Sequence, residues 1–234
     1  MRLRLTLDMT EVTVPNDYKR GLQAFIYSSL SAKSSQEIHD LDSSIVKLFT
    51  YSNLLGKCHN VDGGVEFEGR VNWFIASADL MFLDEIYRTV LETKTLSLHG
   101  NYIPIKDIKA LDNLNINGVV EYRTISPVTV YRSDEEGNRE YGNPLDPDYR
   151  EYIYSSLRRK YEQFYRETCN EYMNLYLIQN CKKRIVGYKN YKYEAYDYTF
   201  KFDSSERIHN LIMDTGIGSR NASGFGMVEI VWWL

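Results

Sequence analysis

The chain has 234 residues, with 28 Lys and Arg against 32 Asp and Glu, a formal net charge of −4 and 43% hydrophobic residues. That length suits two small domains or one large one, and the composition is ordinary for a soluble globular protein. No apolar run approaches the ~20 residues that span a bilayer, and residues 1–8 alternate like a strand rather than forming a signal peptide. We therefore expect a cytoplasmic protein that makes no membrane contact.

The first half of the chain predicts the element order β-α-β-β-α-β. Residues 2–8 alternate as a strand, and the turn at 14–17 supplies the N-cap of a helix from 18 to 30. The later elements are a strand at 47–51, a hairpin at 57–69, a strand at 70–78, a helix capped by Ser77 or Asp79 and ending near 92, and strands within 96–108. This order is the split βαβ pattern.

The second half predicts roughly the same order again. Its elements are a strand at 121–132 interrupted by Pro127, a polar loop at 133–147, a long helix at 148–180, a tyrosine-rich hairpin at 182–202 that turns near 189–190, a helix capped by Ser204 or Ser205 and ending near 213, and a strand at 227–234. We expect an α+β fold with two tandem ferredoxin-like (RRM-like) domains, 1–117 and 118–234, although no repeat is visible in the sequence itself.

Cysteine and histidine spacing argues against a disulfide framework and a metal site, and we expect no cofactor. Cys58, Cys169 and Cys181 are isolated from one another, and the four histidines show no HExxH spacing. The adjacent pair Cys58-His59 is better explained as the flank of the hairpin than as metal ligands, which are usually spaced apart. We expect no bound metal.

The segment from 216 to 226 holds four glycines in eleven residues and is called the glycine-rich loop below. Such loops often cradle phosphates through backbone N–H groups. It is neither a Walker A loop nor a Rossmann turn, because no Gly-Lys-Ser/Thr follows and the order here is helix, loop, strand. A tight loop without a ligand is an equally weighted alternative.

The net charge argues mildly against nucleic-acid binding, but the charge is unevenly distributed. Residues 155–201 hold ten Lys and Arg against five Asp and Glu, with tyrosines interleaved among the cations of the expected hairpin. Cations that hold phosphates and aromatic rings that stack on bases are how proteins bind exposed nucleotides. The alternative is an amphipathic hairpin with half of those tyrosines in the core. The run 158–160 is better explained as a solvated helix face.

Four segments carry a resemblance to a known family. The pattern Gly216-x-Gly218 with Gly224-Phe-Gly-Met-Val228 resembles the signature of the CRISPR-associated repeat-processing endoribonucleases, the Cas6 family of the RAMP superfamily. The segments 22–27, 38–52 and 125–130 resemble the family's first helix, its catalytic region and the opening strand of its second domain. The resemblance implies two ferredoxin-like domains and metal-independent cleavage of CRISPR repeat RNA. It also implies attack by a 2′-OH that leaves a 2′,3′-cyclic phosphate and a 5′-OH.

The same resemblance implies the site residues. Tyr27, His39 and Lys47 would be catalytic, because this reaction needs a base, an acid and a cation near the phosphorane. The expected RNA contacts are Lys182, Lys183, Arg184, Lys192, Gly218, Ser219, Arg220 and Asn221. Each catalytic candidate also has an ordinary explanation: a packed helix tyrosine, a solvated loop histidine and a solvated edge lysine. His59, His99 and His209 are fallback candidates, with His209 the strongest.

The expected partner is CRISPR repeat RNA in a precursor transcript, and the family context allows subunits of a CRISPR effector complex and a second copy of the chain. Two other functions stay open. One is a non-cleaving member of the same superfamily that holds repeat RNA as a scaffold. The other is a ferredoxin-like ligand-binding or regulatory protein unrelated to RNA.

Overall fold

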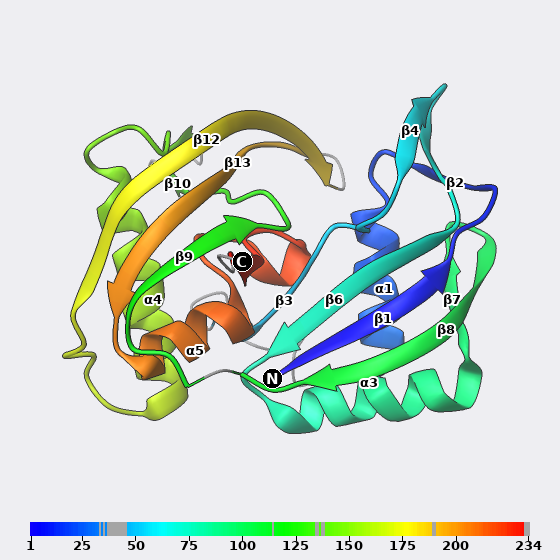
Figure 1. Ribbon diagram of the computed structural model, residues 1–234, viewed down its shortest axis with the longest axis horizontal. Coiled ribbons are helices and arrows are strands. Elements are labelled where there is room, and N and C mark those ends of the chain that lie inside the picture. Colours follow the sequence, from blue (N-terminus) through cyan, green and yellow to red (C-terminus); the bar gives the residue numbers. More distant parts are fainter. Residues whose placement is uncertain are drawn as a thin grey trace.

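The computed structural model describes residues 1–32, 34, 36, 46–113, 115–133, 136, 139–188 and 191–231. Two α+β halves lie side by side, each with helices packed against an antiparallel sheet (Figure 1). Each half has its own cluster of buried hydrophobic side chains.

The first half is built on a five-stranded sheet of order β3-β6-β1-β8-β7, with a small sheet of order β2-β5-β4 beside it. Its elements are β1 (Arg2–Asp8), β2 (Val12–Pro15), α1 (Lys19–Ser28), β3 (Phe49–Tyr51), β4 (Cys58–Val61), β5 (Gly64–Phe67), β6 (Arg70–Ser77), α3 (Leu80–Thr93), β7 (Thr95–Leu98) and β8 (Asn101–Leu111). Leu3, Leu5 and Leu7 alternate along β1 into the core, and the strand pairs with β6 on one edge and β8 on the other.

The second half repeats the arrangement with a four-stranded sheet of order β12-β13-β9-β14. Its elements are β9 (Gly118–Thr124), β10 (Tyr131–Ser133), β11 (Arg139–Tyr141), α4 (Tyr149–Tyr165), β12 (Met173–Tyr188), β13 (Tyr191–Ser204), α5 (Glu206–Thr215), the 3-10 helix η1 (Asn221–Ser223) and β14 (Val228–Ile230). The strand orders β3-β6-β1-β8 and β12-β13-β9-β14 are equivalent, so the predicted tandem ferredoxin-like fold is confirmed. The boundary between 117 and 118 stays a prediction.

Three local predictions are wrong. The turn expected at 14–17 is present at 16–18, directly after β2, but the expected N-cap is absent, because α1 starts after Tyr18, whose side chain makes no cap bond. The helix expected at 148–180 ends at Tyr165, because Arg166 takes the left-handed conformation and residues 173–188 pair with β13. The strand expected at 121–132 ends at Thr124, and β11 lies within the expected loop. At 173–180 tertiary pairing overrides the helix preference of Met, Leu and Gln.

The two long strands β12 and β13 arch over the second half (Figure 1). Their pairing shifts register twice along its length, and such irregularities bend a strand and increase its twist. The arch carries the tip of this hairpin toward the first half, which places Tyr188 against helix α1.

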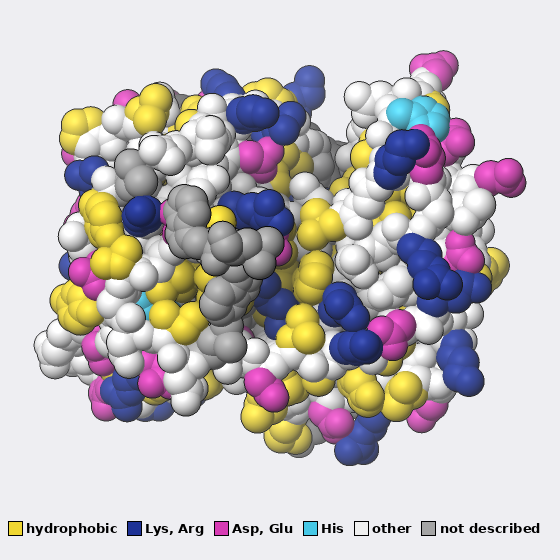
Figure 2. Space-filling model, in the orientation of Figure 1, with side chains coloured by type: hydrophobic (Ala, Val, Ile, Leu, Met, Phe, Trp, Pro, Cys, Tyr) yellow, Lys and Arg dark blue, Asp and Glu magenta, His cyan; other side chains and the backbone are white. Residues whose placement is uncertain are grey.

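Contacts across the two halves are polar as well as apolar. The buried Arg2 of β1 donates hydrogen bonds to the backbone oxygens of Met213 and Val228, at 2.9 and 2.8 Å. Ala76 of the first half packs with Ile125 and Met227 of the second. On the face shown in Figure 2, Lys and Arg side chains near the junction of the halves lie beside Asp and Glu. Among the described residues, no helix is both long and apolar enough to cross a membrane.

Candidate active site

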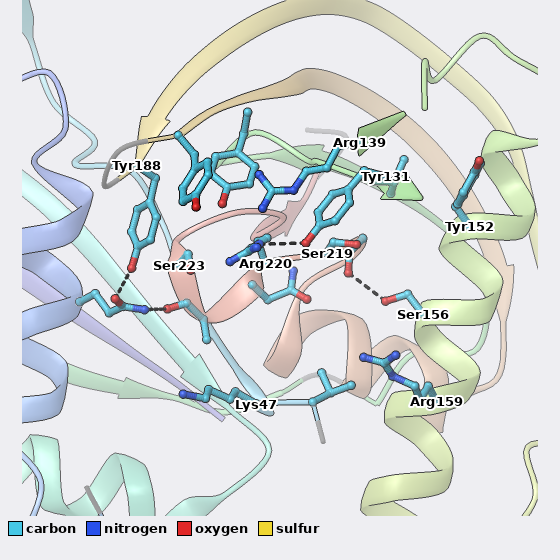
Figure 3. A pocket seen from close by; sticks show the side chains of 18 of the residues that line it. Lys47, Tyr131, Arg139, Tyr152, Ser156, Arg159, Tyr188, Ser219, Arg220 and Ser223 are labelled. Carbon is cyan, nitrogen blue, oxygen red and sulfur yellow. Dashed lines mark hydrogen bonds between the residues drawn. The ribbon is translucent and has the colours of Figure 1, made fainter. Parts of the chain in front are cut away.

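A cavity of about 980 Å³ lies between the two halves. Helix α1 and residues 46–47 form its wall in the first half. Helix α4, the hairpin β10–β11, the start of β13 and the glycine-rich loop form its wall in the second half (Figure 3). The cavity therefore exists only when both halves are folded and docked.

The side chains that line this cavity are cationic and aromatic. The cations are Lys47, Arg139, Arg159 and Arg220, and six tyrosines join them. No Asp or Glu is among the lining residues in the described part of the chain. A cleft lined by charges of one sign focuses the potential and attracts counter-charged ligands, so this cavity favours an anion that also carries aromatic groups. The net charge of −4 gave no sign of this local excess.

Two of the predicted catalytic residues meet in the cavity. The Lys47 Nζ donates a hydrogen bond to the Tyr27 hydroxyl at 3.2 Å and lies 5.4 Å from the centroid of the same ring. Burial raises the pKa of Tyr27 to about 12, so its hydroxyl keeps its proton at neutral pH. Tyr27 can therefore orient a group or relay a proton, while Lys47 supplies positive charge.

The position of Lys47 depends on the second half. The backbone N–H of the preceding residue, Val46, donates to the Gln163 Oε1 at 2.8 Å, and the Gln163 Nε2 donates to the Val46 oxygen at 2.7 Å. Gln163 lies on α4, so a helix of one half fixes the backbone that carries a cation of the other.

The third predicted catalytic residue, His39, lies outside the described residues. None of the fallback histidines lines the cavity. His209 is 2% exposed, its Nδ1 accepts from the Tyr122 hydroxyl at 2.8 Å, and its Nε2 donates to the Gly118 oxygen at 2.8 Å. Burial lowers the pKa of His209, which keeps the ring neutral. Its role is to tie α5 to β9.

His59 lies on the exposed β4, beside Glu66 and Glu68 at 3.9 and 3.5 Å. His99 lies in the turn between β7 and β8. Neither His59 nor His99 lines the cavity, so His39 stays the histidine candidate for catalysis.

Side chains from both halves hold the carbonyl groups of the glycine-rich loop. From α1, the Lys19 Nζ donates to the Gly224 oxygen and the Gln23 Nε2 donates to the Ala222 oxygen. From α4, the Lys160 Nζ donates to the Gly216 oxygen at 2.7 Å. The Ser156 Oγ of the same helix donates to the Gly218 oxygen at 2.8 Å (Figure 3). The loop is thus fixed at both ends.

The glycines of this loop are required by packing. A Cβ on Gly224 would lie 2.5 Å from the Tyr51 ring, and one on Gly226 would lie 2.0 Å from the Ile217 oxygen. Both residues also have positive φ, 81° and 73°, which favours glycine. Asn221 closes the loop internally, since its Nδ2 donates to the oxygens of Ile217 and Phe225 at 2.9 and 3.0 Å.

Among the predicted RNA contacts of the loop, Gly218, Ser219, Arg220 and Asn221 all line the cavity. The backbone N–H of Ser219 donates a hydrogen bond to the Thr129 oxygen at 2.8 Å. The Arg220 Nε donates to the Tyr131 hydroxyl at 3.0 Å, which leaves the terminal nitrogens of its guanidinium for a ligand. Arg220 is therefore the member of this set best placed to meet a phosphate.

The predicted basic residues of the hairpin β12–β13 lie away from this cavity. Lys183 pairs with Glu194 and Arg184 with Asp197, each at 2.7 Å across the hairpin. Lys182 and Arg184 border a second, shallower hollow that also contains Glu229, and Lys192 is exposed. Of the five interleaved tyrosines, Tyr188, Tyr193, Tyr196 and Tyr198 are buried, so the amphipathic alternative explains most of that pattern.

Several residues of the site were missed from the sequence. The sequence predicts Arg139 in a polar loop and Arg159 and Lys160 on a solvated helix face. In the structure, Arg139 and Arg159 line the cavity and Lys160 is 1% exposed. A signal was present for Lys160, because it lies three residues after Leu157 on the buried stripe of α4. No local pattern marked Arg139.

Known proteins resemble this chain along its whole length. The model for the C-terminal part of the CRISPR-associated protein Cas6 matches residues 111–230, just over half of the chain. The chain belongs to the Cas6 family. A relative in Methanocaldococcus jannaschii named "CRISPR-associated endoribonuclease Cas6 1" is 23% identical over 97% of this chain and 92% of its own length.

Solved structures of similar proteins agree with the Cas6 fold. One described as "CRISPR associated protein Cas6" has a TM-score of 0.83 at 23% identity and covers 99% of both chains. Another, described as "An RAMP protein binding different RNA substrates", has a TM-score of 0.86 at 20% identity and covers 99% of this chain and all of its own. The Cas6 model match contains the cavity wall of the second half, whereas Tyr27 and Lys47 lie outside it.

Proposed function

We propose that this chain is an endoribonuclease that binds CRISPR repeat RNA and cleaves it in the cavity between its two halves. The observation that carries the proposal is the contact of Lys47 with Tyr27 in a cavity that holds four cations and no carboxylate among its described lining. Membership of the Cas6 family and relatives named as endoribonucleases support the same activity.

The reaction assigned to this cavity is an internal transesterification. The 2′-oxygen of one nucleotide forms a bond to the adjacent phosphorus as its proton passes to a base, and the bond from phosphorus to the 5′-oxygen breaks. The leaving oxygen takes a proton, so the products carry a 2′,3′-cyclic phosphate and a 5′-OH. We assign proton transfer to His39, charge stabilisation to Lys47 and orientation of the reacting groups to the neutral Tyr27 hydroxyl.

This mechanism uses side-chain cations instead of a metal ion. Within the described ranges, no three His, Cys, Asp or Glu side chains gather as a cation site. Lys47 lines the cavity beside Tyr27 and can offset the charge that develops on the phosphorane. Metal independence is therefore part of the proposal.

The test is an assay of precursor RNA that contains the CRISPR repeat, run in EDTA with the full chain. We expect specific cutting in EDTA, products with cyclic phosphate ends, and loss of cutting when the nucleotide at the cut site is 2′-deoxy. Loss of activity in EDTA that Mg²⁺ restores would overturn the metal-independent mechanism. Tight repeat binding without any product would favour the scaffold function.

A further inference from the structure

Two arginines and three tyrosines form a separate cluster on one side of the cavity, called the arginine–tyrosine cluster below. Its members are Tyr131 and Arg139 of the β10–β11 hairpin, Tyr191 and Tyr193 of β13, and Arg220 of the glycine-rich loop. In Figure 3, Arg139 and Arg220 both lie beside Tyr131, and a dashed line joins Arg220 to the Tyr131 hydroxyl. Lys47 enters the cavity from the opposite side, so this cluster is distinct from the Tyr27–Lys47 contact.

The guanidinium groups lie within cation–π distance of the tyrosine rings. The Arg139 Cζ lies 5.3, 5.0 and 5.1 Å from the ring centroids of Tyr131, Tyr191 and Tyr193. The Arg220 Cζ lies 5.8 and 5.1 Å from those of Tyr131 and Tyr193. A guanidinium in cation–π contact still carries N–H donors on its edge, and these suit the oxygens of a phosphate.

Among the residues that the structure describes, no acidic side chain neutralises either guanidinium. Within the described part of the chain, no carboxylate lies within ion-pair distance of Arg139 or Arg220, whereas Arg184 on the β12–β13 hairpin pairs with Asp197. Two uncompensated cations beside a cavity attract an anion. They also repel each other, and the electron-rich faces of the tyrosines between them partly offset that repulsion.

Tyr191 is the member of the cluster that is open to a ligand. It is 58% exposed, whereas Tyr193 behind it is 1% exposed and stacks edge-on against it at a centroid distance of 6.5 Å. Tyr141 fastens the hairpin to this strand, since its hydroxyl donates to the Lys192 oxygen at 3.3 Å. Tyr191 thus presents an aromatic face on a supported backbone.

We propose that the arginine–tyrosine cluster is a subsite for one unpaired nucleotide, with its base stacked on Tyr191 and its phosphate on the edges of Arg139 and Arg220. The base must be unpaired and unstacked, because a base inside a helix has no free π-face. A tyrosine face accepts any base, so the subsite selects single-stranded character rather than sequence. This inference rests on the proposed RNA substrate but is independent of cleavage.

The test uses short single-stranded oligonucleotides with methylated 2′-hydroxyls, which cannot be cut, and one 2-aminopurine moved along the sequence. We expect the full chain to quench the fluorescence strongly at one position. Tyr191→Leu should abolish that quenching and weaken affinity about five- to 100-fold, while Tyr191→Phe keeps both. Tyr102→Leu is the matched control, because Tyr102 is 81% exposed on β8 and lies outside the cavity.

Arg139→Gln separates a phosphate contact from a purely structural role. We expect this change to remove about one phosphate contact, which lowers the slope of log affinity against log salt concentration by ~0.7 for a single strand. Uniform quenching at every position, or full affinity in Tyr191→Leu, would overturn the subsite. An unchanged salt slope in Arg139→Gln would overturn the phosphate contact. If the wild-type chain shows the quenching but never cuts repeat RNA, the subsite stands and the nuclease proposal fails.

Discussion

Lys19 on α1 and Lys160 on α4 hold opposite ends of the glycine-rich loop. The Lys19 Nζ donates to the Gly224 oxygen at 2.5 Å, and the Lys160 Nζ donates to the Gly216 oxygen at 2.7 Å. Both side chains are buried, and burial lowers the pKa of each to about 7. Each half therefore holds the loop by a hydrogen bond from a buried amine, and each amine loses its charge near neutral pH.

The first prediction concerns stability against pH. Above about pH 7 the folded chain has released protons that the unfolded chain keeps until about 10.5, so the free energy of unfolding should rise with pH across this window. Lys160→Met should make that rise smaller. Denaturant unfolding at pH 6.5 and pH 9 measures both slopes, with the exposed Lys109→Met as control. Equal slopes in Lys160→Met and wild type would contradict the buried-amine explanation.

The second prediction concerns Lys47. Its charge should matter most as the phosphorane forms, so Lys47→Ala should slow single-turnover cleavage about 10²- to 10³-fold and change repeat affinity only a few-fold. Enzyme in excess over labelled RNA gives the rate, and direct binding gives the affinity. Lys109→Ala, an exposed lysine of the same half, is the matched control. An affinity loss as large as the rate loss would mean that Lys47 only binds RNA.

The third prediction concerns Tyr27. Because burial raises the pKa of this phenol to about 12, its hydroxyl stays protonated between pH 6 and 9. Tyr27→Phe should slow cleavage less than Lys47→Ala does, and it should leave the shape of the pH–rate profile unchanged over that range. Loss of one limb of the profile in Tyr27→Phe would instead make Tyr27 a proton-transfer group.

The fourth prediction separates two histidines. His39→Ala should reduce single-turnover cleavage about 10²- to 10⁴-fold with little change in affinity, as for a general acid or base. His209→Ala should lower the free energy of unfolding, because it leaves the buried Tyr122 hydroxyl and Gly118 oxygen unpaired. Normal cleavage by folded His39→Ala would refute the assignment.

The fifth prediction concerns the basic hairpin. Changing Lys182, Lys183 and Arg184 together to Ala should weaken repeat binding and flatten its salt dependence. A phosphate contact to a single strand contributes ~0.7 to the slope of log affinity against log salt concentration. The slope should fall by less than three such contacts would give, because Glu194 and Asp197 already offset two of these charges. The control changes three exposed lysines of the first half, Lys57, Lys106 and Lys109. An unchanged slope would place the RNA entirely elsewhere.

Local sequence pattern was enough for the β-α-β-β-α-β order of each half and for parts of the core, although it predicted the start of β12 as helix. Leu3, Leu5 and Leu7 mark a strand by alternation, and Leu22, Phe25 and Ile26 mark a helix face by their spacing, because each pattern reflects one buried side of one element. The glycine-rich loop, Tyr27 and Lys47 were also found from the sequence, since they carry the family resemblance.

The tertiary structure alone decided which charges face the cavity. Arg139 lies in a stretch without periodicity and becomes a cavity residue only because β10–β11 folds against Tyr191 and Tyr193. Lys183 and Arg184 look like free cations in the sequence but meet carboxylates across the hairpin. These outcomes depend on pairings between residues far apart in the chain, and periodicity within one segment carries no information about its partner.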